Sequence, residues 1–325
     1  MYNNLMKKRK FRPKEVLLSL TAKCNLRCAH CSIEQRKTVL NKKTALKFIN
    51  ACARAGINRV GFTGGEPFLS LGLMCAISKE AARRGTFFSR VMTNGGWFRT
   101  EKELIQAMRR LFAAGYDGNF CLSVDAFHHQ ELNKCASFAR AATVIWARPD
   151  IVSIAAVQGA KNDETRKRIA ELARLLDGRL AGPRNRPFAI KGAGLFAKIF
   201  YIDLSPIGKA ASLKDPWDGR WFKDDLCMGP GNVLFVLPDG TVKPCCGYAS
   251  DADILTIGSI KRDSPEQLLK NARKNLFISS IFSSGFHPVR KRLERAGVRF
   301  PGKTTNHCFF CHYITRCVPQ LKAFF

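Results

Sequence analysis

The sequence is poor in negative charge and contains no long apolar run. It has 25 Asp and Glu residues against 54 Lys and Arg, a formal net charge of +29. The absence of any apolar run of about 18 residues excludes a typical transmembrane helix. The basic stretch at residues 7–10 is not followed by an adequate apolar segment, so we expect no secretory signal and a cytoplasmic protein.

Internal repeats, low-complexity segments and aromatic-interleaved nucleic-acid motifs are also missing. The basic residues are scattered along the chain rather than gathered in one stretch. We therefore expect no nucleic-acid partner. The charge instead favours a generally basic surface or an anionic partner such as an acidic peptide.

Strand and helix signals alternate over the first two-thirds of the chain. The expected strands are residues 15–21, 59–63, 87–92, 120–124, 151–157 and 197–204. The expected helices are residues 43–55, 69–84, 101–114, 132–147 and 164–176. Strict alternation predicts parallel strands joined by right-handed crossovers. We therefore predict an α/β fold, a partial (β/α)6 barrel at residues 15–210, after a basic N-terminal segment at residues 1–14.

Special residues follow four consecutive strands. Three cysteines come after the first strand, Gly-Gly-Glu-Pro at 64–67 after the second, Thr-Asn-Gly at 93–95 after the third and Ser-Val-Asp at 123–125 after the fourth. In barrels of this kind the working residues lie at the carboxyl ends of the strands. The pattern predicts an enzyme with one site at one mouth of the barrel. Trp97 and His128 are further candidates for residues of that site.

The rest of the chain, residues 211–325, loses the alternation. Pro-Asp-Gly at 238–240 predicts a hairpin between residues 233–237 and 241–243, and helical stretches follow at 265–275 and 289–296. This smaller region has its own cysteines: Cys227, Cys245, Cys246, Cys308, Cys311 and Cys317. The remaining cysteines stand singly in predicted elements and are expected to be buried apolar side chains: Cys52, Cys75, Cys121 and Cys135.

Cys24, Cys28 and Cys31 have the spacing C-x3-C-x2-C. A structural zinc site needs four ligands, and His30 is the one further candidate close by, so zinc stays an alternative. Three thiolates on one loop also suit a 4Fe–4S cluster, which leaves one iron open to a substrate or cofactor.

These motifs together resemble the radical S-adenosylmethionine (radical SAM) superfamily. The resemblance implies that Cys24, Cys28 and Cys31 hold a 4Fe–4S cluster whose open iron binds SAM, the source of a 5′-deoxyadenosyl radical. It implies contacts to SAM or substrate from a further set of residues: Gly64, Gly65, Glu66, Asn94, Asp125 and Lys209. Glu66 would accept hydrogen bonds from the methionine ammonium, and Lys209 would face the SAM carboxylate.

The second cysteine set resembles the auxiliary-cluster regions of radical SAM enzymes that modify ribosomally made peptides, most closely the epipeptide epimerases. That resemblance implies an auxiliary 4Fe–4S cluster held by four thiols: Cys227, Cys245, Cys308 and Cys311. Neighbouring side chains of an extended segment point to opposite sides, so one cysteine of the pair can hold iron while the other faces elsewhere. The resemblance implies that Cys246, the second of the pair, donates a hydrogen atom. Cys317 gives a spacing closer to SPASM-type domains, so the fourth ligand stays open.

The implied activity is epimerisation of L-residues to D-residues in a peptide, with a reductant such as flavodoxin or ferredoxin. Thioether or carbon–carbon crosslinking of a peptide uses the same machinery and gains if Cys246 ligates iron. Epimerisation of a sugar or aminoglycoside is a further alternative, although a cationic aminoglycoside suits a charge of +29 poorly. A non-catalytic metal-binding nucleic-acid protein would explain the charge but leave the strand-end motifs unused.

Overall fold

The computed structural model describes residues 11–159, 161–192, 194–217, 219–222, 231–247 and 251–325. Over the described residues, one sheet has the strand order β11-β10-β9-β1-β2-β3-β4-β5-β8-β7-β6. Its six central strands run parallel, which confirms the expected α/β partial barrel. They are β1 (Glu15–Ser19), β2 (Arg59–Thr63), β3 (Phe87–Thr93), β4 (Asn119–Ser123), β5 (Val152–Gln158) and β8 (Leu195–Asp203).

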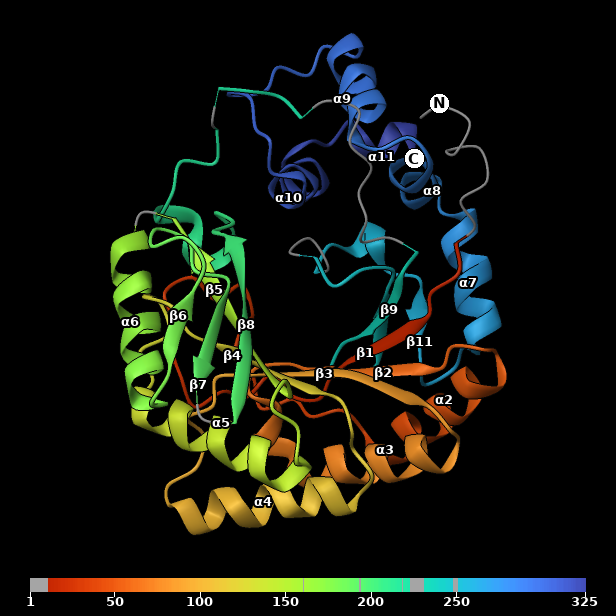
Figure 1. Cartoon of the computed structure of the whole chain (residues 1–325). Helices are drawn as coiled ribbons and strands as arrows, with labels where there is room; N and C mark the ends of the chain where they lie inside the picture. The colour runs from red at the N-terminus through yellow and green to blue at the C-terminus, as the bar shows by residue number, and fades with distance from the viewer. Residues whose placement is uncertain (1–10, 160, 193, 218, 223–230, 248–250) are drawn as a thin grey trace, which may run out of the picture.

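Amphipathic helices cover the outer side of this sheet (Figure 1). They are α2 (Lys42–Arg54), α3 (Leu71–Arg83), α4 (Glu101–Ala113), α5 (Leu132–Trp146) and α6 (Asn162–Leu175). Side-chain caps fix where two of them begin: Asn41 accepts a hydrogen bond from the Thr44 backbone N–H, and Thr100 accepts one from that of Glu103. These helices pack their apolar faces on alternate strand residues.

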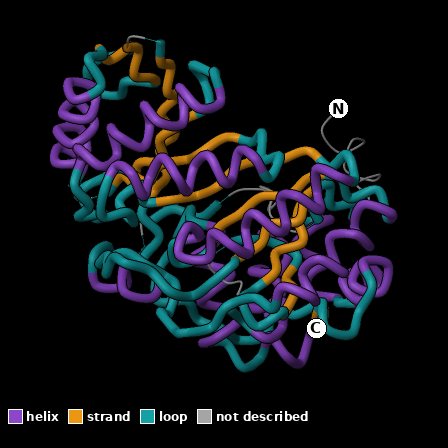
Figure 2. Tube along the Cα trace, turned by 90° about the horizontal axis from the view of Figure 1, so that it is seen from below, coloured by secondary structure: helices purple, strands orange, loops and turns teal. Residues whose placement is uncertain are grey.

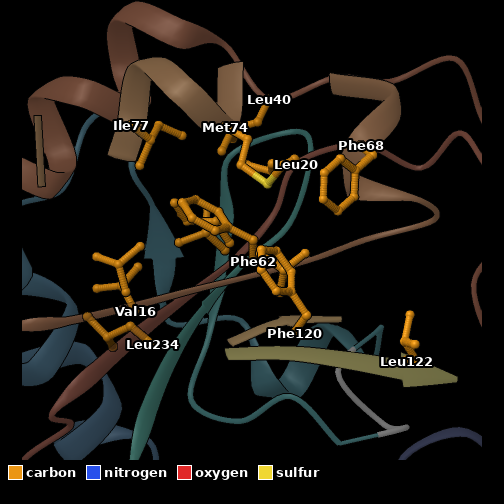
Figure 3. Packing of buried hydrophobic residues seen from close by; sticks show 14 of the residues in the cluster. Val16, Leu20, Leu40, Phe62, Phe68, Met74, Ile77, Phe120, Leu122 and Leu234 are labelled. Carbon is orange, nitrogen blue, oxygen red and sulfur yellow. The ribbon is translucent and has the colours of Figure 1, made fainter. Parts of the chain in front are cut away.

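The main core lies between the strands and these helices. Figure 3 shows Phe62 and Phe120 from the sheet beside Met74 and Phe68, and Val16 beside Leu234. Phe62 and Phe120 are fully buried. Since side chains alternate along a strand, the residues between them point to the other, inner face of the sheet.

The edge beyond β8 differs from the expectation. The sequence predicted no strand between residues 176 and 197, but two short antiparallel strands extend the sheet there, β6 (Arg179–Ala181) and β7 (Ala189–Gly192). They are too short to give a periodic signal, and pairing with β8 rather than local propensity forms them.

The predicted hairpin is confirmed as β9 (Val233–Val236) and β10 (Thr241–Lys243), with β11 (Gly258–Ser259) beside it. β9 pairs in parallel with β1, so the sheet continues past residue 211, where we placed a domain boundary. That boundary stays a prediction.

Helices follow the hairpin: α7 (Pro265–Lys274), α8 (Leu276–Ser283), α9 (Phe286–Arg295), α10 (His307–Cys317) and α11 (Leu321–Phe324). The sequence predicted α7 and α9 but not α8, α10 or α11. Figure 2 shows the helices gathered around the strands from a second direction. Among the described helices, none combines the length and the apolarity that crossing a bilayer requires.

Candidate functional site

The carboxyl ends of the central strands meet around a cavity of about 270 Å³. Residues at the ends of five strands line it: Thr63, Met92, Thr93, Ser123, Ala155, Val157 and Ile202. The loops that follow add Cys24, Cys28, Cys31, His30, Gly64, Gly65, Asn94, Asp125 and His128. The structure therefore brings the residues after four consecutive strands to one mouth, as the sequence predicted.

The cysteine loop is held by the Gly-Gly turn after β2. Gly65 and Glu66 donate backbone hydrogen bonds to the carbonyls of Thr21 and Lys23, each 2.8 Å long. A Cβ on Gly64 would lie 2.5 Å from the Thr21 carbonyl oxygen, and one on Gly65 would lie 2.1 Å from that of Lys23. Gly64 also has φ of +139°, which favours glycine. The two glycines thus allow the turn to press against the start of the cysteine loop.

Three free thiols face the cavity from this loop. Burial, and then the neighbouring thiols Cys31 and Cys24, raise the pKa of Cys28 to about 12, while Lys209 opposes the rise. Three thiolates so close together repel one another, and a cationic iron–sulfur cluster removes that repulsion. The thiols, their shared cavity and the open side of the loop fit a 4Fe–4S cluster.

Glu66 does not line the cavity. Its side chain is fully buried, and it accepts hydrogen bonds from Thr93 Oγ1 (2.8 Å), the Asn94 backbone N–H (2.9 Å) and the Phe68 backbone N–H (3.2 Å). Burial raises the pKa of Glu66 to about 7, although these three donors favour the charged form. In the structure the carboxylate joins the end of β2 to the end of β3, and its contact with SAM stays a prediction.

Asn94 connects this junction to the cysteine loop. Its Nδ2 donates to Asn25 Oδ1 at 2.9 Å and lies 3.8 Å from Cys24 Sγ, while its Oδ1 accepts from the Gly96 backbone N–H at 2.8 Å. Asn94 also lines the cavity, so its amide contacts the Cys24 thiol and faces the space that the cysteine loop borders.

Asp125 makes a similar junction between β4 and β5. It is fully buried, accepts from the Val157 backbone N–H at 3.2 Å and contacts His128 Nδ1 at 2.9 Å. Burial raises the pKa of Asp125, but the hydrogen bond and charge of His128 prevail and lower it. Asp125 thereby orients His128 in the cavity wall.

His30 completes this corner. Its ring lies 4.6 Å from that of His128, and its Nδ1 is buried without a hydrogen-bond partner among the described residues. Burial, and then the neighbouring His128, lower the pKa of His30 to about 4, so it is neutral at physiological pH. His30 therefore offers a neutral imidazole to this part of the cavity wall.

Lys209 lies on a 3-10 turn, η2 (Gly208–Ser212), that packs against the end of the cysteine loop. A Cβ on Gly208 would lie 3.1 Å from Ser32 Cα, and its φ is +61°. Lys209 is near enough to Cys28 to lower that thiol's pKa. Its assignment to the SAM carboxylate stays a prediction.

Two thiols of the second cysteine set approach Gly247. A Cβ on Gly247 would lie 3.4 Å from Cys308 Sγ and 3.8 Å from Cys245 Sγ, so these two thiols approach the same point. Cys311 is buried one turn after Cys308 on α10, while Cys317 is exposed at the end of that helix. Cys227 lies outside the described residues. The sequence missed α10, although it is this helix that places Cys308 and Cys311 on one face.

The adjacent thiols Cys245 and Cys246 have different surroundings. Cys245 is buried, whereas Cys246 is exposed. Desolvation raises the pKa of Cys246, Glu15 and Cys308 raise it further, and Arg90 opposes the rise. Protein atoms thus surround much of the Cys246 side chain, while part of the residue stays exposed to solvent.

The charges of Glu15 and Arg90 act on the Cys246 thiol, and both residues lie on the inner face of the sheet. Glu15 precedes the buried Val16 on β1, and Arg90 precedes the buried Val91 on β3, so both point away from the helix-covered core. Met92, two residues beyond Arg90, shares its face and lines the cavity. The two charged residues that act on the Cys246 thiol therefore share the face of the sheet on which the cavity lies.

The strand order and a three-cysteine cavity at the strand ends define the fold class, and family models agree with it. The model of the Radical SAM superfamily matches residues 18–145, and that of SPASM, an iron–sulfur cluster-binding domain, matches residues 227–290. The chain therefore has a radical SAM domain followed by a SPASM domain. These domains indicate 4Fe–4S clusters and SAM as cofactors, as the sequence predicted.

Individual relatives are similar over parts of the chain. The GTP 3′,8-cyclase of Parasynechococcus marenigrum is 42% identical over 78 residues, 23% of this chain and 22% of the relative. That of a Synechococcus species is 37% identical over 111 residues, 33% of this chain and 31% of the relative. The chain thus spans at most about a third of either curated relative.

Solved structures are similar over nearly the whole chain. Native anSMEcpe with bound AdoMet and Cp18Cys peptide has a TM-score of 0.54 at 14% identity, covering 96% of this chain and 99% of that one. Streptococcus suis SuiB has a TM-score of 0.55 at 12% identity, covering 91% and 77%. At these identities the likeness shows a shared fold.

Proposed function

We propose that this chain is a radical SAM enzyme that epimerises L-residues to D-residues in a ribosomally made peptide. The observation that carries the proposal is the divergence of two adjacent thiols. Cys245 is buried and approaches Gly247 together with Cys308, whereas Cys246 is exposed and lies within the electrostatic influence of Glu15 and Arg90. This difference supports Cys245 as a ligand of an auxiliary cluster and Cys246 as the thiol that reaches a substrate.

When bound, the cluster and SAM supply a 5′-deoxyadenosyl radical. The cysteine loop and Asn94 would determine where the radical forms. Cys246 belongs to a different segment, which follows the hairpin of β9 and β10. A hydrogen atom removed from the substrate Cα on one face is replaced from the opposite face by the Cys246 thiol. The configuration at the substrate Cα is thereby inverted, because the group that removes the hydrogen atom and the thiol that returns one lie on opposite faces of the carbon. The resulting sulfur radical regains an electron from a reductant such as flavodoxin or ferredoxin and a proton from solvent.

Two further observations support a peptide substrate. Phe200 and Ile202 on β8 are 49% and 40% exposed, in register with the inner-face residues Ala155 and Val157. They offer apolar contacts to a substrate side chain near the cavity. The structural neighbour anSMEcpe holds both AdoMet and a peptide within the same fold.

Crosslinking of a peptide is the second candidate. The Cys246 thiol is close enough to Cys308 for that thiol to raise its pKa. A cluster centred nearer Cys246 would use it as a ligand and remove the hydrogen donor. The activity would then move from epimerisation to formation of a thioether or carbon–carbon bond.

The variant Cys246→Ala separates these candidates. The proposal predicts that it keeps the iron of both clusters and still cleaves SAM but no longer yields a D-residue. In deuterated water the wild type gains about one mass unit at the inverted residue, because a thiol hydrogen exchanges with solvent. The readout is mass spectrometry of a co-expressed peptide. Loss of auxiliary iron in the variant supports crosslinking, and undiminished epimerisation would falsify the donor role.

A further inference from the structure

A second cavity, of about 600 Å³, lies on the helical side of the mouth. It is bounded by the turn η1 (Pro67–Ser70), the start of α3 and the exposed side of α4. We call it the α4 groove, defined by Phe68, Leu69, Trp97, Gln106, Arg109 and Arg110. The mechanism above uses none of these residues.

The floor of the α4 groove is apolar and rigid. Phe68 and Trp97 stack with their ring centroids 4.5 Å apart and 7° between the planes. Leu69 beside them is 44% exposed, an unusual state for a large apolar side chain next to a cavity. Such a surface suits an apolar side chain of a partner.

One end of the groove is cationic. Arg109 and Arg110 are exposed on α4, and neither has a carboxylate within ion-pair distance among the described residues. Other exposed arginines do have one, for example Arg83 with Glu80 at 2.7 Å. The two guanidinium groups of the groove are thus available to an external carboxylate.

The groove also adjoins the radical SAM site. Trp97 follows Asn94 by three residues, and Asn25 of the cysteine loop donates to the Gly96 carbonyl at 3.3 Å. A ligand held over Trp97 therefore lies beside the loop that forms one wall of the catalytic cavity. The residues that follow in a peptide ligand held there can extend toward the mouth of the cavity.

We propose that the α4 groove binds an acidic segment of the peptide substrate, separate from the residue that is modified. An apolar side chain packs over Phe68, Leu69 and Trp97, and carboxylates pair with Arg109 and Arg110. A peptide suits the groove better than a nucleic acid, because Leu69 and the stacked pair Phe68 and Trp97 form an apolar surface that a phosphate backbone would leave without an apolar partner. This inference rests on the proposed function, since it names the class of peptide on which the enzyme acts.

The test is fluorescence anisotropy of a labelled short peptide with alternating Glu and Leu, bound to the reconstituted enzyme. The double variant Arg109→Glu/Arg110→Glu should weaken binding about tenfold or more. The control Lys42→Glu/Lys43→Glu makes the same charge change at exposed positions of α2 and should alter affinity less than about twofold. Leu69→Ser should weaken binding without changing charge.

Equal losses in the two double variants would show that only the net charge attracts the peptide, and would overturn the proposal. Displacement of the peptide by single-stranded oligothymidylate, with the same dependence on Arg109 and Arg110, would also overturn it. SAM cleavage without peptide should be unchanged in the groove variants. The epimerase proposal fails separately, by absence of deuterium at an inverted residue in the wild type, whatever the affinities are.

Discussion

Replacing Glu66 by Gln tests whether this carboxylate is a buried junction between strands. Burial raises the pKa of Glu66 from 4.5 to about 7. Between these two values the unfolded chain has released the proton while the folded chain still holds it. The free energy of unfolding therefore falls as pH rises across this window. The difference corresponds to ~3 kcal/mol, at 1.36 kcal/mol for each pKa unit.

The variant Glu66→Gln has no proton to release and should lose this pH dependence. Urea unfolding followed by tryptophan fluorescence, between about pH 5 and pH 7, measures it without SAM. Between these two pH values the wild type should lose ~2 kcal/mol more than the variant, because part of the full titration lies outside this range. Glu103→Gln, at an exposed position, is the matched control. Parallel profiles for wild type and Glu66→Gln would refute the buried carboxylate.

The variant should also disturb the cysteine loop. An amide nitrogen in place of Oε2 would face the Asn94 backbone N–H, leaving two donors opposed at a buried position, at a cost of about 1–3 kcal/mol. Asn94 would shift, and with it the contact to Cys24. The electron paramagnetic resonance spectrum of the reduced, SAM-free cluster should change. A change seen only after SAM is added would instead indicate that Glu66 contacts SAM directly.

Three further outcomes are expected. The anaerobically reconstituted wild type should bind about eight irons, the content of two 4Fe–4S clusters, and cleave SAM; zinc without SAM turnover contradicts the assignment. Replacing the three loop cysteines by Ala should abolish release of 5′-deoxyadenosine while the auxiliary cluster still absorbs, and continued release contradicts the ligand set Cys24, Cys28 and Cys31. Affinity for an acidic peptide should fall as salt screens the net charge of +29, and a constant affinity from low to high salt argues against an anionic substrate.

The structure adds to what the motifs indicate about Glu66 and Asp125, whose contacts with SAM or substrate stay predictions. Their positions after β2 and β4 are evident in the sequence, and the resemblance assigned both to SAM or substrate. In the structure both carboxylates are fully buried and bind backbone N–H groups at the next strand end, Asn94 and Val157. A motif specifies which residue stands at a strand end. The direction of its side chain depends on which donors the neighbouring strand presents.

The sequence by itself determined the alternating α/β fold, the six central strands and the mouth that collects the residues after them. Local hydrophobic periodicity and turn residues encode these features, and parallel strands place their carboxyl ends together. Only the tertiary structure decided that β9 pairs with β1, because that contact joins distant segments by backbone hydrogen bonds that no local pattern specifies. The same pairing anchors the hairpin that leads into Cys245 and Cys246, and so sets the two thiols in different surroundings.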